Sequence, residues 1–281
     1  MRLCFLNPNY FPCTQTSLLN RKEHTSMKNQ HSKKRTTFRP SPQSIKSKLT
    51  SILYPIRCPI CEKIPPSGLS ICPKCYQSIK FVEQPYCYSC GKPLENIEEE
   101  FCFDCRKHPK SFTRGFALAI YNQTTKPSLS AIKYHNRRQH ISFYVEETIQ
   151  NYGPLFTSLH LDAILPVPIH KKRMKKRGFN QASLFARSLG KQLRIPVYDS
   201  VLIRTLNTLP QKTLSPEKRL ENLQKAFSLH PELHSMLPFE RVLLVDDIYT
   251  TGSTMEAITR ILKNAGVKEV YIFSICIGKG I

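Results

Sequence analysis

Long hydrophobic runs are missing from this sequence of 281 residues. A membrane-spanning helix needs about 20 consecutive apolar residues, and no stretch approaches that length, so we expect no transmembrane segment. The apolar start at residues 3–6 ends at Asn7 and Pro8, which makes it too short for the hydrophobic region of a secretory signal. These two absences favour a cytoplasmic protein.

Acidic residues are also scarce. The chain has 20 Asp and Glu against 42 Lys and Arg, which gives a formal net charge of +22. Such a surplus points to phosphate-rich partners, although lysines often serve solubility alone. Residues 1–50 hold ten of the basic residues and the single acid Glu23, and so contribute +9.

Residues 1–50 are polar, rich in Ser and Thr, and without hydrophobic periodicity. We predict that they form a disordered basic extension, because such a segment cannot bury enough apolar surface to fold. Two alternatives stay open. The segment could be an Arg-rich organelle transit peptide, or the sequence could be overextended by a start placed upstream of Met27.

Cysteines, in contrast, are abundant and regularly spaced. Eight of the eleven form four Cys-x-x-Cys pairs, and each pair offers two thiolates with the spacing of a tetrahedral zinc site. Disulfides are disfavoured because no secretion signal accompanies them, and a redox motif would occur once rather than four times. We predict two zinc sites in consecutive zinc ribbons over residues 53–105, with interleaved pairing as the alternative. The expected ligand sets are Cys58, Cys61, Cys72 and Cys75 for one zinc, and Cys87, Cys90, Cys102 and Cys105 for the other.

The segment of residues 53–105 is rich in proline and lacks regular periodicity, as expected of a module held together by metal. Substitution of Cys58 or Cys87 should therefore unfold this module and leave the larger domain folded. Zinc ribbons either brace a chain or contact nucleic acid, and the sequence favours neither role.

Residues 112–281 have the pattern of an α/β domain with a parallel sheet flanked by helices. Apolar runs predict strands at 115–121, 164–168, 242–245 and 267–277, and helical periodicity predicts helices at 127–134, 139–150 and around Phe185, Leu189 and Leu193. Residues 205–215 have the composition of a mobile loop, and residues 216–223 that of a short helix with proline at its first position. Such a loop could close over a substrate, or lie on the surface without a role.

The most informative stretch begins with the strand at 242–245. Asp246 and Asp247 follow it, then the small residues Thr250, Thr251, Gly252, Ser253 and Thr254, and then a helix that Gly266 ends. Free amide groups and short hydroxyls at a helix start favour a phosphate, and the two carboxylates can accept hydrogen bonds from sugar hydroxyls. Helix capping alone would explain a single such motif, but the combination predicts a site for ribose 5-phosphate.

A basic run lies directly after the predicted strand at 164–168. It holds six Lys or Arg within residues 171–177. Most runs of this kind are solvated faces, but the end of a strand in a parallel sheet is where ligands bind. We therefore predict a loop that receives a pyrophosphate group, with Arg177 as its main ligand and Lys171, Lys172 and Arg173 as helpers.

Two resemblances sharpen these predictions. The stretch from Asp246 to Thr254 resembles the phosphoribosyl-diphosphate signature of type I phosphoribosyltransferases. Together with the two zinc ribbons, several further residues make residues 53–277 similar to the competence protein F (ComF) family. These are Pro-Val-Pro-Ile-His at 166–170, Arg173, Arg177-Gly-Phe-Asn-Gln at 177–181, Arg204, Gln211, Leu214, Arg219, Asn222 and Phe227.

The ComF resemblance implies a type I phosphoribosyltransferase fold in a bacterial protein associated with uptake of single-stranded DNA during natural transformation. It also implies binding of phosphoribosyl diphosphate with Mg²⁺. Asp246 and Asp247 would hold the ribose, residues 250–254 the 5-phosphate, and Lys171, Arg173 and Arg177 the pyrophosphate.

Alternatives of other classes stay open. One is an active phosphoribosyltransferase of nucleotide metabolism or salvage with an unidentified acceptor, and another is a regulatory ligand binder. Thr250 stands where relatives that take hypoxanthine or guanine commonly carry Asp, so the resemblance argues against 6-oxopurine salvage. A role in DNA handling lacks one sequence feature, because no stretch combines aromatic and basic residues into a stacking platform.

Overall fold

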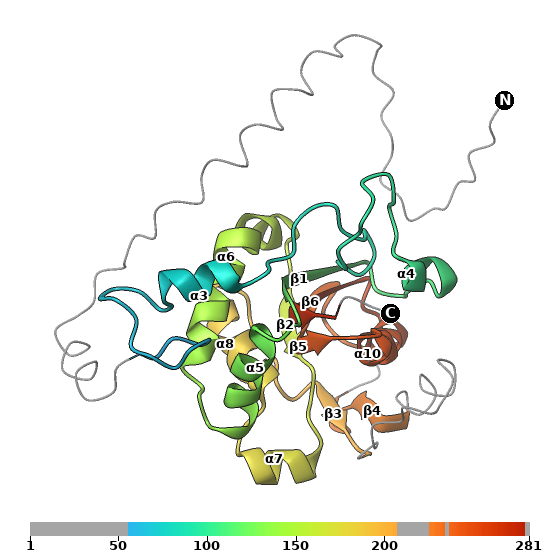
Figure 1. Cartoon of the computed structure of the whole chain (residues 1–281). Helices are drawn as coiled ribbons and strands as arrows, with labels where there is room; N and C mark the ends of the chain where they lie inside the picture. The colour runs from blue at the N-terminus through green and yellow to red at the C-terminus, as the bar shows by residue number, and fades with distance from the viewer. Residues whose placement is uncertain (1–55, 207–224, 234–235, 279–281) are drawn as a thin grey trace. The chain divides into compact units, whose positions relative to one another are not determined.

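Four parallel strands form the central sheet, in the order β1–β6–β5–β2 (Figure 1). The computed structural model describes residues 56–206, 225–233 and 236–278. The strands are β1 (Arg114–Ile120), β2 (Ala163–Pro166), β5 (Arg241–Tyr249) and β6 (Glu269–Ile277). They are nearly continuous apolar runs because both faces of the sheet are covered.

Helices α5 (Thr125–Tyr134), α6 (His140–Ser158) and α8 (Gln181–Leu193) cover one face of the sheet. Helix α10 (Ser253–Asn264) covers the other face, together with the antiparallel pair β3 (Leu202–Arg204) and β4 (Phe227–Leu229) (Figure 1). The sequence periodicity explains these faces, since Phe185 and Leu189 of α8 are buried on one side and Ile258 and Leu262 of α10 on the other.

From the neighbouring strands β5 and β2, the chain continues in opposite directions across the sheet, so the winding of the sheet reverses between them. The chain runs from β5 through α10 to β6. From β2 it runs through α8 to Val197, which forms a parallel bridge with Ile164 on the outer side of β2. Ligands of open α/β sheets bind at such a reversal, beyond the carboxyl ends of the strands. The end of β5 is therefore the place where this fold positions a site.

The two zinc ribbons are copies of one pattern. In each, a Cys-x-x-Cys turn is followed by a second pair that opens a short helix: Cys72 precedes α3 (Pro73–Ser78) and Cys102 precedes α4 (Phe103–Lys107). The ligand atoms of Cys58, Cys61, Cys72 and Cys75 lie within 4.8 Å of one another, as do those of Cys87, Cys90, Cys102 and Cys105. The consecutive pairing is thus confirmed over the interleaved one.

The ribbons pack against β1, the edge strand of the sheet. Ile120 donates a backbone hydrogen bond to Lys80 (2.8 Å), and Gly115 donates one to Ser89 (2.6 Å). A Cβ atom on Gly115 would lie 2.9 Å from the Cα and the carbonyl oxygen of Cys90, so the two backbones are in direct contact. The buried cysteines belong to the same clusters as the sheet residues. The structure therefore does not support ribbons that unfold independently of the sheet.

The predicted strands and helices are present with small shifts in their ends, and three differences have physical causes. Helix α6 continues to Ser158, through Gly153 and Pro154, because Tyr152 and Phe156 stack in a buried aromatic cluster, which outweighs local propensity. The basic run forms helix α7 (Lys171–Arg177) rather than a loop. Strand β5 extends through the acidic pair to Tyr249. The loop and short helix predicted over residues 205–223 lie, apart from residues 205 and 206, outside the described residues.

Candidate functional site at the end of β5

The acidic pair occupies the last part of β5. Successive side chains of a strand point to opposite faces, so the two carboxylates meet different neighbours. Asp247 is 6% exposed; it forms an ion pair with Lys133 of α5 and accepts a 2.9 Å hydrogen bond from Gln181 Nε2 of α8. Asp246 is partly exposed and accepts a hydrogen bond from the backbone amide of Asp247.

The two carboxyl groups differ in their pKa. Burial raises the pKa of Asp246 well above its usual value, and the neighbouring charge of Asp247 raises it further, against a smaller opposing effect of Lys133. Burial also acts on Asp247, but the ion pair with Lys133 and the hydrogen bond from Gln181 lower its pKa below the usual value. The pair therefore holds one charge firmly on Asp247 and a second, more easily protonated group on the open side.

Residues 250–254 form the turn between β5 and α10, which we call the phosphate loop. Gly252, at its centre, has a φ of +76° and is the residue that precedes α10. A Cβ atom at this position would lie 2.1 Å from the hydroxyl oxygen of Tyr249, so only glycine fits. Because Gly252 has no side chain to cap the helix, the first amide groups of α10 stay available to an anion.

Helix α7 presents one basic face to this site. His170 accepts a hydrogen bond from Lys172 at its start, and Gly178 ends it at a φ of +80°. Arg173 and Arg177 are four residues apart and share a face. Arg177 donates a hydrogen bond to Gln181, the same side chain that contacts Asp247, so it is linked to the acidic pair through one residue.

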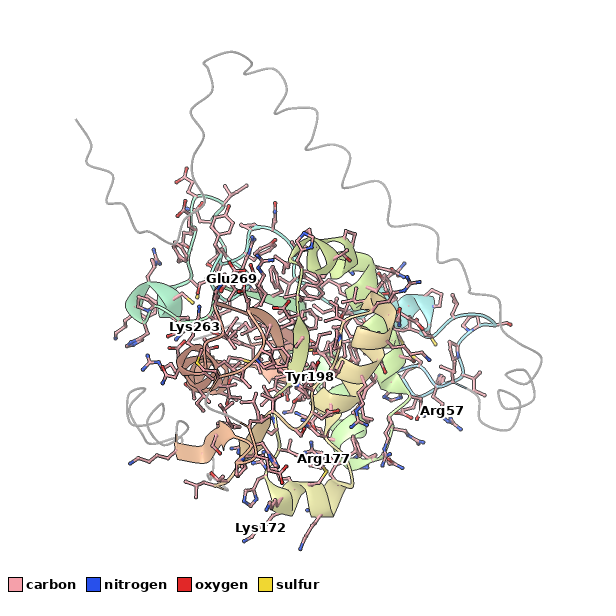
Figure 2. The ribbon with its side chains drawn as sticks, turned by 180° about the vertical axis from the view of Figure 1, so that it is seen from behind. Arg57, Lys172, Arg177, Tyr198, Lys263 and Glu269 are labelled. Atoms are coloured by element: carbon pink, nitrogen blue, oxygen red, sulfur yellow. The ribbon has the colours of Figure 1, made fainter. Side chains whose placement is uncertain are left out.

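The other basic residues of α7 lie farther from the acidic pair. Figure 2 shows Lys172 at the same end of the described structure as Arg177, and Glu269, at the amino end of β6, away from both. Lys171 and Lys172 are exposed, and within residues 56–206, 225–233 and 236–278 no hydrogen bond or ion pair joins them to Asp246 or Asp247. Burial lowers the pKa of Arg204, and the nearby charge of Arg173 lowers it further. Asp246 opposes this effect.

An aromatic side chain lies beside these arginines. Tyr134, at the end of α5, is 66% exposed, and the guanidinium of Arg177 lies 5.3 Å from the centre of its ring. Arg138 stacks on Phe179 at 4.3 Å. We call Tyr134, Arg138, Arg177 and the exposed lysines of α7 the basic platform. It combines an exposed aromatic ring with positive charge, and Arg177 links it to the acidic pair through Gln181.

The cysteine clusters fit zinc in chemistry and in spacing. Four sulfurs around one zinc, with bonds of about 2.3 Å, lie about 3.8 Å apart along each edge of the tetrahedron. The sulfurs of Cys61 and Cys72 are 3.8 Å apart, and those of Cys90 and Cys102 are 3.7 Å apart. Lys92, buried beside the second cluster and paired with Asp104, offsets part of the negative charge that four thiolates bring.

We predict two zinc ions per chain, one in each cluster. Metal analysis of protein purified under reducing conditions should find a ratio of two zinc ions to one chain, because both sites offer four thiolates and no open position. A ratio of one or less would contradict the assignment. Titration of freed thiols after metal release provides the control, since eight cysteines should become reactive on removal of both ions.

Comparisons with known proteins agree with this arrangement. Residues 49–106 match the family described as the double zinc ribbon domain, and residues 177–280 match the phosphoribosyl transferase domain. Competence protein F of Haemophilus influenzae is 40% identical over 114 residues, which cover 41% of this chain and 49% of that protein. The DNA utilization protein YhgH of Escherichia coli K12 is 28% identical over 224 residues, which cover 78% of this chain and 89% of that protein.

The chain thus combines a double zinc ribbon domain with a phosphoribosyl transferase domain, and it is similar to a competence protein and a DNA utilization protein. It spans about half the length of the Haemophilus relative and most of the length of the Escherichia relative. Among solved structures, an adenine phosphoribosyltransferase of Trypanosoma brucei, in complex with AMP, pyrophosphate and ribose-5-phosphate, is similar with a TM-score of 0.34 and 12% identity over 73% of this chain and 78% of that one.

Within this fold, four residues near the acidic pair were not predicted as site residues. Gln181 and Arg204 appeared only in the family resemblance, and Lys133 and Tyr134 not at all. A lysine and a tyrosine at a helix end usually face solvent, so no local signal marks them. Only the packing of α5 against β5 brings Lys133 to Asp247 and Tyr134 to Arg177.

None of the helices in the described part of this chain is both long enough and apolar enough to cross a membrane.

Proposed function

We propose that this protein binds phosphoribosyl diphosphate at the end of β5 and handles single-stranded DNA in the natural transformation of bacteria. Two of its relatives are named a competence protein and a DNA utilization protein. The observation that carries the first part is the combination of Asp246 and Asp247 with the phosphate loop, at the point where the winding of the sheet reverses. Calorimetric titration of the full chain with phosphoribosyl diphosphate and Mg²⁺ tests this assignment.

Each part of the ligand has matching chemistry in the site. The ribose hydroxyls would donate to the carboxylates of Asp246 and Asp247, and the 5-phosphate would accept hydrogen bonds from the amides and hydroxyls of the phosphate loop. Arg177, with Arg173 and Lys171 as helpers, would pair with the pyrophosphate. Bound Mg²⁺ would neutralise pyrophosphate charge next to the acidic pair.

The basic platform supports the DNA part of the proposal. Single-stranded nucleic acids bind where aromatic rings stack on bases and basic side chains follow the backbone. Tyr134 offers the ring, and α7 and Arg138 offer the charge, within one surface. The sequence alone does not reveal this combination, because Tyr134 and α7 are far apart along the chain.

We expect Tyr134→Ala to weaken binding of single-stranded DNA about 5- to 150-fold, since stacking of one base contributes about 1–3 kcal/mol. Tyr134→Phe should retain most of the affinity. Charge reversal of Lys175 and Lys176 should flatten the dependence of log affinity on log salt by about 0.7 for each lost phosphate contact. Fluorescence anisotropy with a labelled oligonucleotide over a series of salt concentrations measures both effects.

Two controls accompany this experiment. Tyr88 is another exposed tyrosine with an arginine, Arg114, 5.8 Å from its ring, but it lies on the second ribbon, so Tyr88→Ala should change DNA affinity little. A chain that starts near Ser51 lacks the basic extension and should still bind. If that shorter chain binds phosphoribosyl diphosphate but no DNA, the DNA role of the folded part is refuted, and a nucleotide-metabolism enzyme becomes the better hypothesis.

The zinc ligands also bear on the compartment. Eight thiolates persist as metal ligands only where they are kept reduced. We therefore assign the protein to the bacterial cytoplasm.

A further inference from the structure

Tyr249 connects the second zinc ribbon to the phosphate loop. It is the last residue of β5 and is 3% exposed. Its ring lies under Gly252, where any added Cβ atom would come within 2.1 Å of the hydroxyl oxygen and within 2.5 Å of the ring carbon that carries it. The same side chain belongs to the buried cluster that holds the four cysteines of the second ribbon. Burial raises the pKa of the Tyr249 hydroxyl, and the neighbouring Cys90 raises it further. One buried side chain thus packs in the cluster of the second zinc site and lies against the centre of the loop.

A second contact joins the same two parts. Ser111, shortly after the second ribbon, donates hydrogen bonds to the carboxylate of Glu256 from its amide (2.7 Å) and its hydroxyl (2.6 Å). Glu256 lies in the first turn of α10 and is 3% exposed. Because buried charge-assisted hydrogen bonds are strong and directional, the start of α10 is fixed relative to the end of the second ribbon.

The first ribbon makes no comparable contact in the described part of the chain. Its buried cysteine, Cys58, belongs to the hydrophobic cluster that holds α5 and α6. Its hydrogen bonds to the helices run to α6, from Ser70 to Glu146 (3.0 Å) and from Tyr76 to Glu147 (3.1 Å). The two zinc sites, although copies of one pattern, are therefore attached to different parts of the domain.

We propose that the second zinc site, acting through Tyr249, holds the phosphate loop in the conformation that binds a phosphate group, and that the first zinc site does not. Tyr249 is then a positioning residue. The coupling extends the proposed phosphoribosyl diphosphate site, and the test that uses this ligand rests on the proposed function. Linkage requires the coupling to act in both directions. A ligand bound to the loop must raise the affinity of the second site for zinc, and loss of that zinc must weaken ligand binding.

Zinc release measures this coupling directly. The full chain is exposed to a zinc-selective chromophoric chelator and a thiol-alkylating reagent, with and without phosphoribosyl diphosphate and Mg²⁺. Peptide mapping of the alkylated cysteines then tells the two sites apart. We expect the ligand to slow labelling of Cys87, Cys90, Cys102 and Cys105 at least about fivefold, the lower end of common coupling energies, and to leave the rate for the first site unchanged. Equal protection of both sites, or of neither, would overturn the proposal.

Tyr249→Phe tests the role of the hydroxyl, because it keeps the ring. We expect this variant to lose most of the selective protection and to bind the ligand about 3- to 10-fold more weakly, the range for the loss of one polar interaction of a buried hydroxyl. Tyr76→Phe is the matched control, since it removes a tyrosine hydroxyl beside the first ribbon, and it should keep both properties. A Tyr249→Phe variant with undiminished selective protection would contradict the assigned role.

A ligand-free measurement separates this inference from the proposed function. If calorimetry finds no binding of phosphoribosyl diphosphate to the wild-type chain, the proposed function fails, but the coupling is still measurable by hydrogen exchange. Amides of residues 250–256 should exchange faster in Tyr249→Phe than in the wild type and should be unchanged in Tyr76→Phe. Equal exchange in all three proteins would overturn the inference by itself.

Discussion

The double substitution Asp246→Asn, Asp247→Asn should abolish detectable binding of phosphoribosyl diphosphate with Mg²⁺. Asparagine keeps the shape of each side chain but removes the charge that attracts the metal and strengthens hydrogen bonds from the ribose hydroxyls. Each lost charge-assisted hydrogen bond costs about 1.5–3 kcal/mol, so two of them predict a loss of at least about 100-fold in affinity. Calorimetric titration of the variant and the wild type measures this loss.

A matched control lies at the other end of the same strand. Asp162 accepts hydrogen bonds from the amides of Glu240 and Arg241, both 2.8 Å long, at the amino end of β5. Asp162→Asn should therefore affect stability without affecting ligand binding. The double variant should unfold at a somewhat lower temperature than the wild type, because Lys133 loses its partner. Undiminished binding by a folded double variant would show that the acidic pair does not hold the ribose.

The second large effect concerns the contact between the second ribbon and the sheet. Gly115→Ala should lower the free energy of unfolding by about 1–3 kcal/mol, the usual cost of overpacking. The added Cβ atom would lie 2.9 Å from two backbone atoms of Cys90, and neither is the end of a flexible side chain that could move aside. Denaturant unfolding followed by far-ultraviolet circular dichroism, with zinc release recorded in the same samples, measures the change.

Gly153→Ala provides a control for which the expected change in the free energy of unfolding has the opposite sign. Gly153 lies inside α6, and an added Cβ atom would meet only Ile149, at an ordinary 3.5 Å. Alanine in a helix is favoured over glycine by about 1 kcal/mol, so this variant should be slightly more stable. In Gly115→Ala, zinc release and loss of secondary structure should shift together to lower denaturant concentration. A separate early release of zinc from an otherwise unchanged domain would show that the ribbons and the sheet unfold independently.

Features that depend on residues close together along the chain could be predicted from the sequence. The apolar run at 242–245, the glycine and hydroxyl residues after it, and the spacing of the cysteines are local patterns, and each corresponds to the expected strand, turn or metal cluster. The basic run illustrates the limit of such patterns. Residues 171–177 contain neither glycine nor proline, and with His170 capping the start and Gly178 the end they form a helix, although their charge suggested a loop.

Residues that meet only through the fold could not be predicted in this way. Lys133 reaches Asp247, and Tyr134 reaches Arg177, because the turn after β1 sends α5 along the sheet toward the end of β5. Tyr249 was interpreted only as part of the motif. Its surroundings come from a ribbon more than one hundred residues earlier, with which it shares a buried cluster, and from the glycine three residues later. Sequence spacing carries no signal for contacts of this kind.

Phosphorus nuclear magnetic resonance of phosphoribosyl diphosphate, titrated with the full chain in the presence of Mg²⁺, tests the central claim most directly. The 5-phosphate and the two pyrophosphate phosphorus atoms give separate resonances, so the part of the ligand that is bound can be identified. The account predicts that the 5-phosphate resonance shifts or broadens saturably, and that Gly252→Val removes this effect because a side chain cannot fit beside Tyr249. A 5-phosphate resonance that stays unchanged, while only the pyrophosphate resonances respond, would contradict the assignment of the phosphate loop.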